Sequence, residues 1–220
     1  MIKNILDMIE VTDQYLDYLS DKIEFSSTGF PIMTKDMFLI DYPDQIIPFY
    51  NRNNRLVRDP SKTALCFFCP DSPLYVRLEK VFDELPEYRR YKGVIGLDIT
   101  VTEDMDLEWQ NAIMLLNQLF LAVLGCNGIK IVLNARNGSP STLSNFSSVP
   151  KNVMCATSFL GCSNLKNDMN YSFISKILYL MPSKLLIYGK RDRIAEKQLD
   201  TMGIDYRIYP DMHRISKGVA

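Results

Sequence analysis

The sequence predicts an α/β fold: a mainly parallel β-sheet of about five or six strands, flanking helices and an additional N-terminal helix. Four short apolar segments in the second half of the chain end in polar residues, and the gaps between and after them can hold helices. Parallel strands need crossovers of about a dozen residues or more, so this alternation is typical of βα units. A small or incomplete βα barrel is the alternative, because such repeats alone do not determine closure. The four segments are 93–100, 129–136, 153–159 and 184–190.

The first 30 residues are predicted to form a helical extension. Apolar side chains in 2–24 recur at steps near three and four, which is typical of an amphipathic helix with a buried Ile and Leu face. The sequence Ser26-Ser-Thr-Gly29 ends this helix. Residues 31–63 contain four prolines and a polar turn, so we expect strand fragments or a segment that wraps across the sheet.

The main domain is expected to span residues 31–210. The helix over 106–125 is apolar around most of its circumference, which indicates burial on more than one side. The segment 137–150 is Ser-rich and without periodicity, and we expect a mobile loop beside the ligand edge. Residues 211–220 are expected to be a frayed tail. The remaining expected elements are a strand at 64–69, helices at 74–91, 165–181 and 190–201, and a last strand at 205–209.

Composition disfavours several classes of function. The chain has 220 residues with 47% hydrophobic content, enough for one sizeable domain. Lys plus Arg number 25 and Asp plus Glu 26, so no overall basic field favours nucleic acid or acidic membranes. No apolar run approaches the ~18 residues of a membrane helix. The N-terminus carries acidic residues where a signal peptide needs an apolar core, so we expect a cytoplasmic protein.

The sequence gives no positive indication of a metal or a cofactor. Cys66 and Cys69 have a redox or zinc spacing, yet they lie in an apolar strand and no second Cys-x-x-Cys accompanies them. We therefore expect all five cysteines to be reduced and free of metal. Neither a phosphate-binding Gly-x-x-x-x-Gly-Lys loop nor a dinucleotide Gly-x-Gly-x-x-Gly motif is present. His213 is the only histidine, which removes the base of most Ser–His or Cys–His mechanisms.

The candidate site lies where the predicted strands end, because open parallel sheets bind ligands outside the carboxyl ends of their strands. Asp98 is the candidate catalytic residue, as a general base or nucleophile, and a helix N-cap is the alternative. Asn134 and Arg136 are spaced to face the same way, and the guanidinium fork suits phosphate or carboxylate. A structural ion pair between Arg136 and Asp98 is the alternative. The remaining candidate ligand-binding residues are Ser158, Tyr188 and Lys190.

The stretch from about Phe38 to Lys190 resembles a family of domains of unknown function found in phages, plasmids and other mobile elements of bacteria. The resemblance implies a mobile-element origin and a single domain over 38–210, and it implies no established activity. The matching pieces, in order, are Ile47-Pro-Phe49, Cys66-Phe-Phe-Cys-Pro-Asp71, Gly93-Val-Ile-Gly-Leu-Asp-Ile-Thr100, Gln110-Asn111, Gly128-Ile-Lys-Ile-Val-Leu-Asn-Ala-Arg136, Val149-Pro-Lys-Asn152, Thr157-Ser-Phe-Leu-Gly-Cys162 and Pro182-Ser-Lys-Leu-Leu-Ile-Tyr-Gly189.

Two functions follow from these observations, and the sequence leaves open whether the protein is an enzyme. The first is a site for a small anion or a nucleotide-type ligand at the strand ends. The second is a non-catalytic interaction protein that contacts a host or phage protein through residues 2–24 and 137–150. Residues 2–24 would also suit contact with a second copy of the chain.

Overall fold

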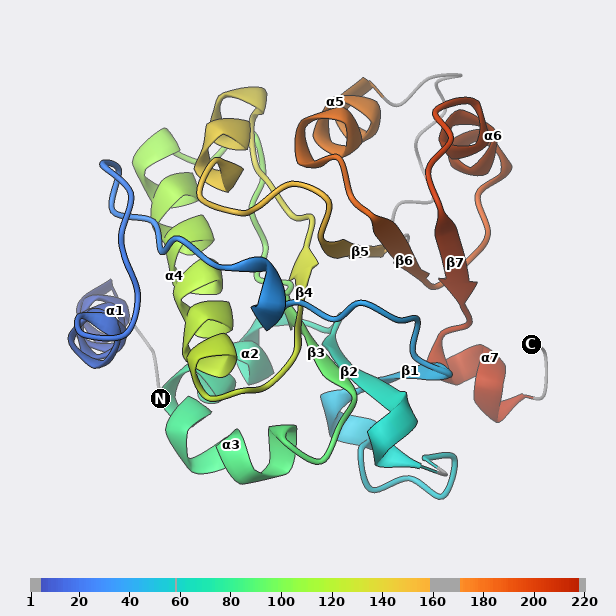
Figure 1. The fold of residues 1–220 in the computed structure, drawn as a ribbon, viewed down its shortest axis with the longest axis horizontal. Coiled ribbons are helices and arrows are strands. Elements are labelled where there is room, and N and C mark those ends of the chain that lie inside the picture. The colour runs from blue at the N-terminus through green and yellow to red at the C-terminus, as the bar shows by residue number, and fades with distance from the viewer. Residues whose placement is uncertain (1–4, 58, 159–170, 218–220) are drawn as a thin grey trace.

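Seven parallel strands form one sheet in chain order, β1 to β7, in the computed structural model. The model describes residues 5–57, 59–158 and 171–217. The sheet curls until it is nearly closed into a barrel, with helices outside it (Figure 1). The parallel α/β prediction is confirmed, but the described residues contain seven strands where five or six were expected. The strands are β1 (Gln45–Pro48), β2 (Thr63–Phe67), β3 (Gly93–Leu97), β4 (Ile131–Asn134), β5 (Met154–Ser158), β6 (Lys184–Tyr188) and β7 (Tyr206–Tyr209).

The inside of the curled sheet is filled by side chains from every strand. At its centre Phe68 stacks on Tyr188, with ring centroids 5.4 Å apart. Because these side chains are buried and pack on one another, the interior is a packed core, as in closed βα barrels. The strand residues of this inner core are Ile46, Ala64, Cys66, Ile95, Val132, Met154, Ala156, Leu186, Tyr188 and Tyr209.

Helices cover the outer face of the sheet. The segment predicted as one helix over 74–91 forms two helices, which are separated at Lys80. The sequence suggested one helix because buried apolar residues continue on both sides of Lys80. The predicted helix at 165–181 is described only from residue 171 onward, and residues 165–170 lie outside the described residues. The helices are α1 (Ile5–Leu19), α2 (Asp71–Glu79), α3 (Val81–Tyr88), α4 (Leu107–Cys126), α5 (Tyr171–Leu180), α6 (Arg193–Thr201) and α7 (Met212–Ser216).

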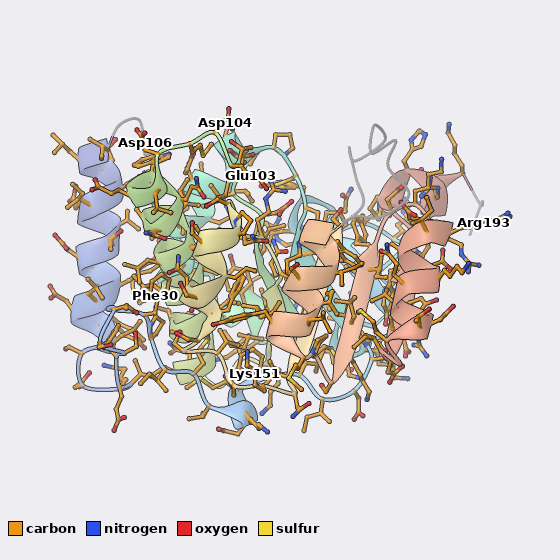
Figure 2. The ribbon with its side chains drawn as sticks, turned by 90° about the horizontal axis from the view of Figure 1, so that it is seen from above. Phe30, Glu103, Asp104, Asp106, Lys151 and Arg193 are labelled. Carbon is orange, nitrogen blue, oxygen red and sulfur yellow. The ribbon has the colours of Figure 1, made fainter. Side chains whose placement is uncertain are left out.

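Helix α4 is the central helix of the outer layer. Figures 1 and 2 both place it between α1 and the sheet. In the described part of the chain it is the one helix long and apolar enough to cross a membrane, and 61% of the most apolar window is buried inside the protein. Its apolar circumference is therefore explained by packing on two sides, as the sequence predicted.

Helix α1 packs on α4 through a different face from the one predicted. The buried residues are Met8, Val11, Tyr15 and Leu19. Ile5, Leu6 and Ile9 are exposed, by 55%, 71% and 50% respectively, so this half of the predicted Ile and Leu face is not buried on the domain. Its burial on a second chain stays a prediction. The Tyr15 hydroxyl donates to the carbonyl of Leu78 at 2.5 Å, which fixes α1 against the last turn of α2.

Residues 38–44 cross the amino ends of the strands and join the start of the domain to its end. Leu39 N donates to Ile131 O at 2.9 Å, and Lys184 Nζ donates to Ile40 O at 2.9 Å. Tyr209 donates its hydroxyl to Pro43 O at 2.8 Å. Just before β1, the chain therefore contacts β4, β6 and β7, which confirms the predicted wrap across the sheet. We call residues 38–44 the closing segment.

Two segments expected to be irregular have regular structure. Residues Pro140–Phe146 form the 3-10 helix η4, so the expected loop at 137–150 contains regular structure over half of its length, and its mobility stays a prediction. The amide side chain of Gln118 fixes this segment to α4, donating to Asn145 O at 2.8 Å and accepting from Ser148 at 3.1 Å. The tail is also helical over α7, where the Asp211 side chain accepts from Arg214 N at 3.0 Å. The other 3-10 turns are η1 (Lys35–Met37), η2 (Phe49–Asn51) and η3 (Pro60–Lys62).

Candidate functional site

Three of the predicted site residues meet at the carboxyl edge of the two central strands β3 and β4. Asp98 follows β3 directly, Asn134 is the last residue of β4, and Arg136 lies two residues beyond. The strands pair in parallel, with Ile95 opposite Val132, so their ends reach the same edge.

The three side chains are in contact through Asp98. Asn134 Nδ2 donates to Asp98 Oδ1 at 3.0 Å and to the carbonyl of Leu97 at 2.9 Å. Arg136 Nη1 lies 3.9 Å from the same carboxylate oxygen. Asp98 is not the N-cap of the following helix, because that position is Asp106. Of the two readings of Arg136, ligand contact and ion pair, the geometry shows a loose ion pair that leaves most guanidinium donors unused.

Burial is the largest influence on the pKa of Asp98. It raises the pKa of the carboxyl, whereas the Arg136 guanidinium, the Asn134 hydrogen bond and the Lys176 ammonium lower it. A second carboxylate, Asp71, also raises this pKa and accepts from both the backbone and the hydroxyl of Thr100, at 3.1 and 3.0 Å. Asp71 was missed in the sequence, where it reads as a turn residue after β2. Its position at the start of α2, just after a strand end, was the available signal.

The guanidinium of Arg136 has N–H groups without hydrogen-bond partners in the described part of the chain. Its side chain is 36% exposed, while its Nε is buried without a hydrogen-bond partner in the described part of the chain. The Oδ1 atom of Asn117, on α4, is also buried without a partner among those residues. Both side chains line a cavity of about 10 Å³ between α4 and the sheet, the size of roughly one water molecule. One end of the guanidinium therefore faces this cavity and the other reaches toward the strand edge.

The other three candidates occupy different surroundings. Ser158 ends β5 opposite Tyr188 in the register of β6. Tyr188 is only 2% exposed, accepts a hydrogen bond from Met212 N at 3.1 Å, and has a pKa raised by burial, so it belongs to the inner core. Lys190 lines an open groove beside β7. The structure therefore brings together Asp98, Asn134 and Arg136, and it places Lys190 in different surroundings.

Of the four described cysteines, Cys66 and Cys155 are buried in the core, while Cys69 and Cys126 are half-buried. Burial raises the pKa of the thiols of Cys66 and Cys69, and raises that of Cys155 to about 12, so all three are neutral thiols near pH 7. Cys162 lies outside the described residues. Within the described ranges, no three His, Cys, Asp or Glu side chains lie close enough to hold a metal ion. The expected absence of bound metal stays a prediction.

Residues 25–207 match a family model described as a domain of unknown function, DUF4417. A search of curated proteins and a search of solved structures found no match. The matched region contains β1 to β6, the start of β7 and all three residues of the Asp98 cluster, whereas α1 precedes it. Since the match covers most of the chain, this protein belongs to the DUF4417 family.

Proposed function

We propose that this protein binds a small anionic ligand, of phosphate or nucleotide type, at the carboxyl edge of the sheet. The supporting observation is the contact of Asp98 and Asn134 beside a guanidinium that Asp98 only partly neutralises. The edge is also where parallel α/β sheets bind their ligands. Following the family resemblance, we assign the protein to a phage or another bacterial mobile element.

Arg136 is the anion-holding residue in this proposal. A bidentate Arg–carboxylate pair has two N–H···O bonds shorter than 3 Å. The 3.9 Å separation from Asp98 is longer than that, so an incoming anion would not have to displace a strong pair. A guanidinium has five N–H donors in a planar fork, which is enough for a phosphate and the carboxylate together.

Asp98 is the candidate acid or base. A carboxyl whose pKa is raised by burial transfers protons more effectively near neutral pH than a surface carboxyl. Asn134 orients it through the 3.0 Å hydrogen bond. The chemistry proposed is proton transfer to or from the bound ligand.

Isothermal titration calorimetry with inorganic phosphate tests the proposal. Arg136→Ala should weaken binding at least tenfold while leaving the melting temperature within about 2 °C, because a strand-end side chain contributes little to the core. Arg136→Lys should retain part of the affinity. The control is Arg90→Ala, which removes an exposed arginine paired with Glu87 and should bind like the wild type.

Two results would count against the proposal. In one, Arg136→Ala binds inorganic phosphate with wild-type affinity. In the other, Arg136→Ala and Arg136→Lys both unfold, which would identify Arg136 as a structural partner of Asp98.

The interaction function has an independent observation in its favour. Ile5, Leu6 and Ile9 form an exposed apolar patch on α1, outside the region that matches the family. Contiguous exposed apolar side chains are typical of protein contacts. Sedimentation velocity tests contact with a second copy: the wild type should sediment faster with rising concentration, and a triple change of these residues to Ser should not. Concentration-independent sedimentation of the wild type would exclude self-association.

A further inference from the structure

An open groove of about 690 Å³ runs beside β7, at the free edge of the sheet. Four cationic side chains line it: Lys190 and Arg191 after β6, Arg207 on β7 and Arg214 on α7. Tyr206 and Ile208 contribute apolar surface to the same lining. Within the described residues β7 pairs as a strand only with β6.

The region around this groove is basic although the whole chain is nearly neutral. Residues 184–220 contain eight Lys or Arg and five Asp or Glu, whereas residues 1–183 contain 17 and 21. The net charge of −1 therefore conceals a positive C-terminal part with a net charge of +3 and an acidic remainder with −4. A locally positive concave surface attracts anions even where the total charge does not.

Two of the four cations are not neutralised by a carboxylate. Arg191 Nε lies 3.1 Å from the carboxylate oxygens of Glu196, and Arg214 Nη1 lies 3.1 Å from Asp211. Arg207 instead lies over the Tyr42 ring, 4.7 Å from its centroid, and has no ion pair in the described part of the chain. Lys190 makes neither a hydrogen bond nor an ion pair with the residues that the structure describes. The groove thus presents two uncompensated positive charges.

We propose that this groove is a second ligand site, separate from Arg136, that binds a small molecule carrying two or more linked phosphate groups. The two phosphates match the uncompensated charges of Lys190 and Arg207. The apolar surface of Tyr206 and Ile208 suits a planar ring on the same ligand, and the volume falls within the ~300–1,000 Å³ of small-molecule sites. A nucleoside diphosphate or triphosphate has this combination of groups.

Equilibrium binding of ATP, pyrophosphate and adenosine to the full chain tests this site. ATP and pyrophosphate should bind and adenosine should not, and the affinity should fall with added salt because exposed charges are screened. The double variant Lys190→Ala/Arg207→Ala should weaken ATP and pyrophosphate binding at least tenfold. Neither side chain belongs to the core, so the melting temperature should not change.

Arg193→Ala is the matched control. Arg193 begins α6 three residues after Lys190, points outward in Figure 2, and is absent from the groove lining. Its removal should leave ATP binding unchanged. A loss equal to that of the double variant would mean that general surface charge, rather than the groove, attracts the ligand.

Arg136→Ala separates this proposal from the preceding one. If ATP binding disappears in Arg136→Ala and stays at wild-type strength in Lys190→Ala/Arg207→Ala, the groove site is wrong and the strand-edge site stands. The opposite pattern supports the groove alone. If a single-stranded DNA dodecamer binds to the groove more tightly than ATP, the occupant is a polynucleotide and the small-ligand proposal fails.

Discussion

At the scale of single residues, Asp98 is a buried carboxyl whose pKa is subject to opposing influences. Its carboxyl sits beside a guanidinium and accepts an amide hydrogen bond, and both favour the charged form. Burial nevertheless outweighs them and raises the pKa. Desolvation therefore costs more than these two neighbours return, as is common for buried charges.

The first prediction concerns the pH dependence of stability. Because the folded state holds the Asp98 proton more tightly than the unfolded state, its contribution to stability should fall as pH rises above the ordinary carboxyl pKa of 3.8. Asp98→Asn has no such titration and keeps an oxygen for the Asn134 bond. Urea unfolding from pH 4 to pH 7 should therefore show the variant gaining stability relative to the wild type. A relative loss would mean that Arg136 dominates over burial.

The sequence located part of this site. Asp98, Asn134 and Arg136 were predictable because neighbouring parallel strands end at one edge, whatever the overall curvature. Lys190 and Tyr188 were not, because their surroundings depend on how far the sheet curls and which face each residue takes. Alternation along β6 directs Tyr188 into the inner core, and the free edge of β7 places Lys190 beside a groove.

At the scale of elements, packing of α1 decides which of its apolar residues are structural. The buried stripe from Met8 to Leu19 rests on α4, while the exposed patch of Ile5, Leu6 and Ile9 does not. Both sets are apolar and both recur at helical spacing, so periodicity alone could not distinguish them. The position of α4 determines which of the two sets is buried.

The second prediction separates the two faces of α1. Deleting residues 1–20 should lower the solubility, and it should lower the free energy of unfolding by several kcal/mol. The reason is that fully burying each of Tyr15 and Leu19 is worth about 2 kcal/mol. Changing Ile5, Leu6 and Ile9 to Ser should leave the unfolding free energy within about 0.5 kcal/mol. Equal melting temperatures for the truncated and full-length chains would show that α1 is only an appendage.

The third prediction concerns Gly138, where η4 approaches the start of α4. A Cβ there would lie 2.2 Å from Gln110 Oε1, the oxygen that accepts from Ser139 N at 2.7 Å. Gly138→Ala should destabilise the protein by about 1–3 kcal/mol, because overpacking displaces this side chain. In chemical denaturation the double variant with Gln110→Ala should lose less than the sum of the two single variants. Strict additivity would show that the clash is relieved elsewhere.

At the scale of the whole molecule, the near-closure of the sheet is the feature that the sequence left undecided. The parallel direction of the strands follows from the length of their connections, and the sequence predicted it, whereas the chain-order pairing came only from the structure. The seventh strand is β1, a four-residue segment that ends in Pro48 and is too short to show a readable pattern. Closure depends on contacts between residues 40–43 and β6 and β7, which no local pattern encodes.

The fourth prediction tests that closure. Tyr209→Phe removes a buried hydrogen bond to the Pro43 carbonyl, and it should cost about 1–3 kcal/mol because the acceptor remains desolvated. Tyr42→Phe removes an exposed bond to Asp205, 2.9 Å long, and should cost less than 1 kcal/mol. The two changes are chemically identical, so equal costs in thermal unfolding would show that the closing segment contributes no buried contact.

The closing segment also has a consequence for how the protein is made. Its bonds to Lys184, Asp205 and Tyr209 join residues 144, 163 and 166 positions apart. A ribosome adds about 5–20 residues per second, so residues 40–43 are synthesised roughly 7 to 33 seconds before their partners. During that interval the closing segment lacks its partners on β6 and β7. The contacts between the closing segment and β7 can therefore form only after β7 has been synthesised.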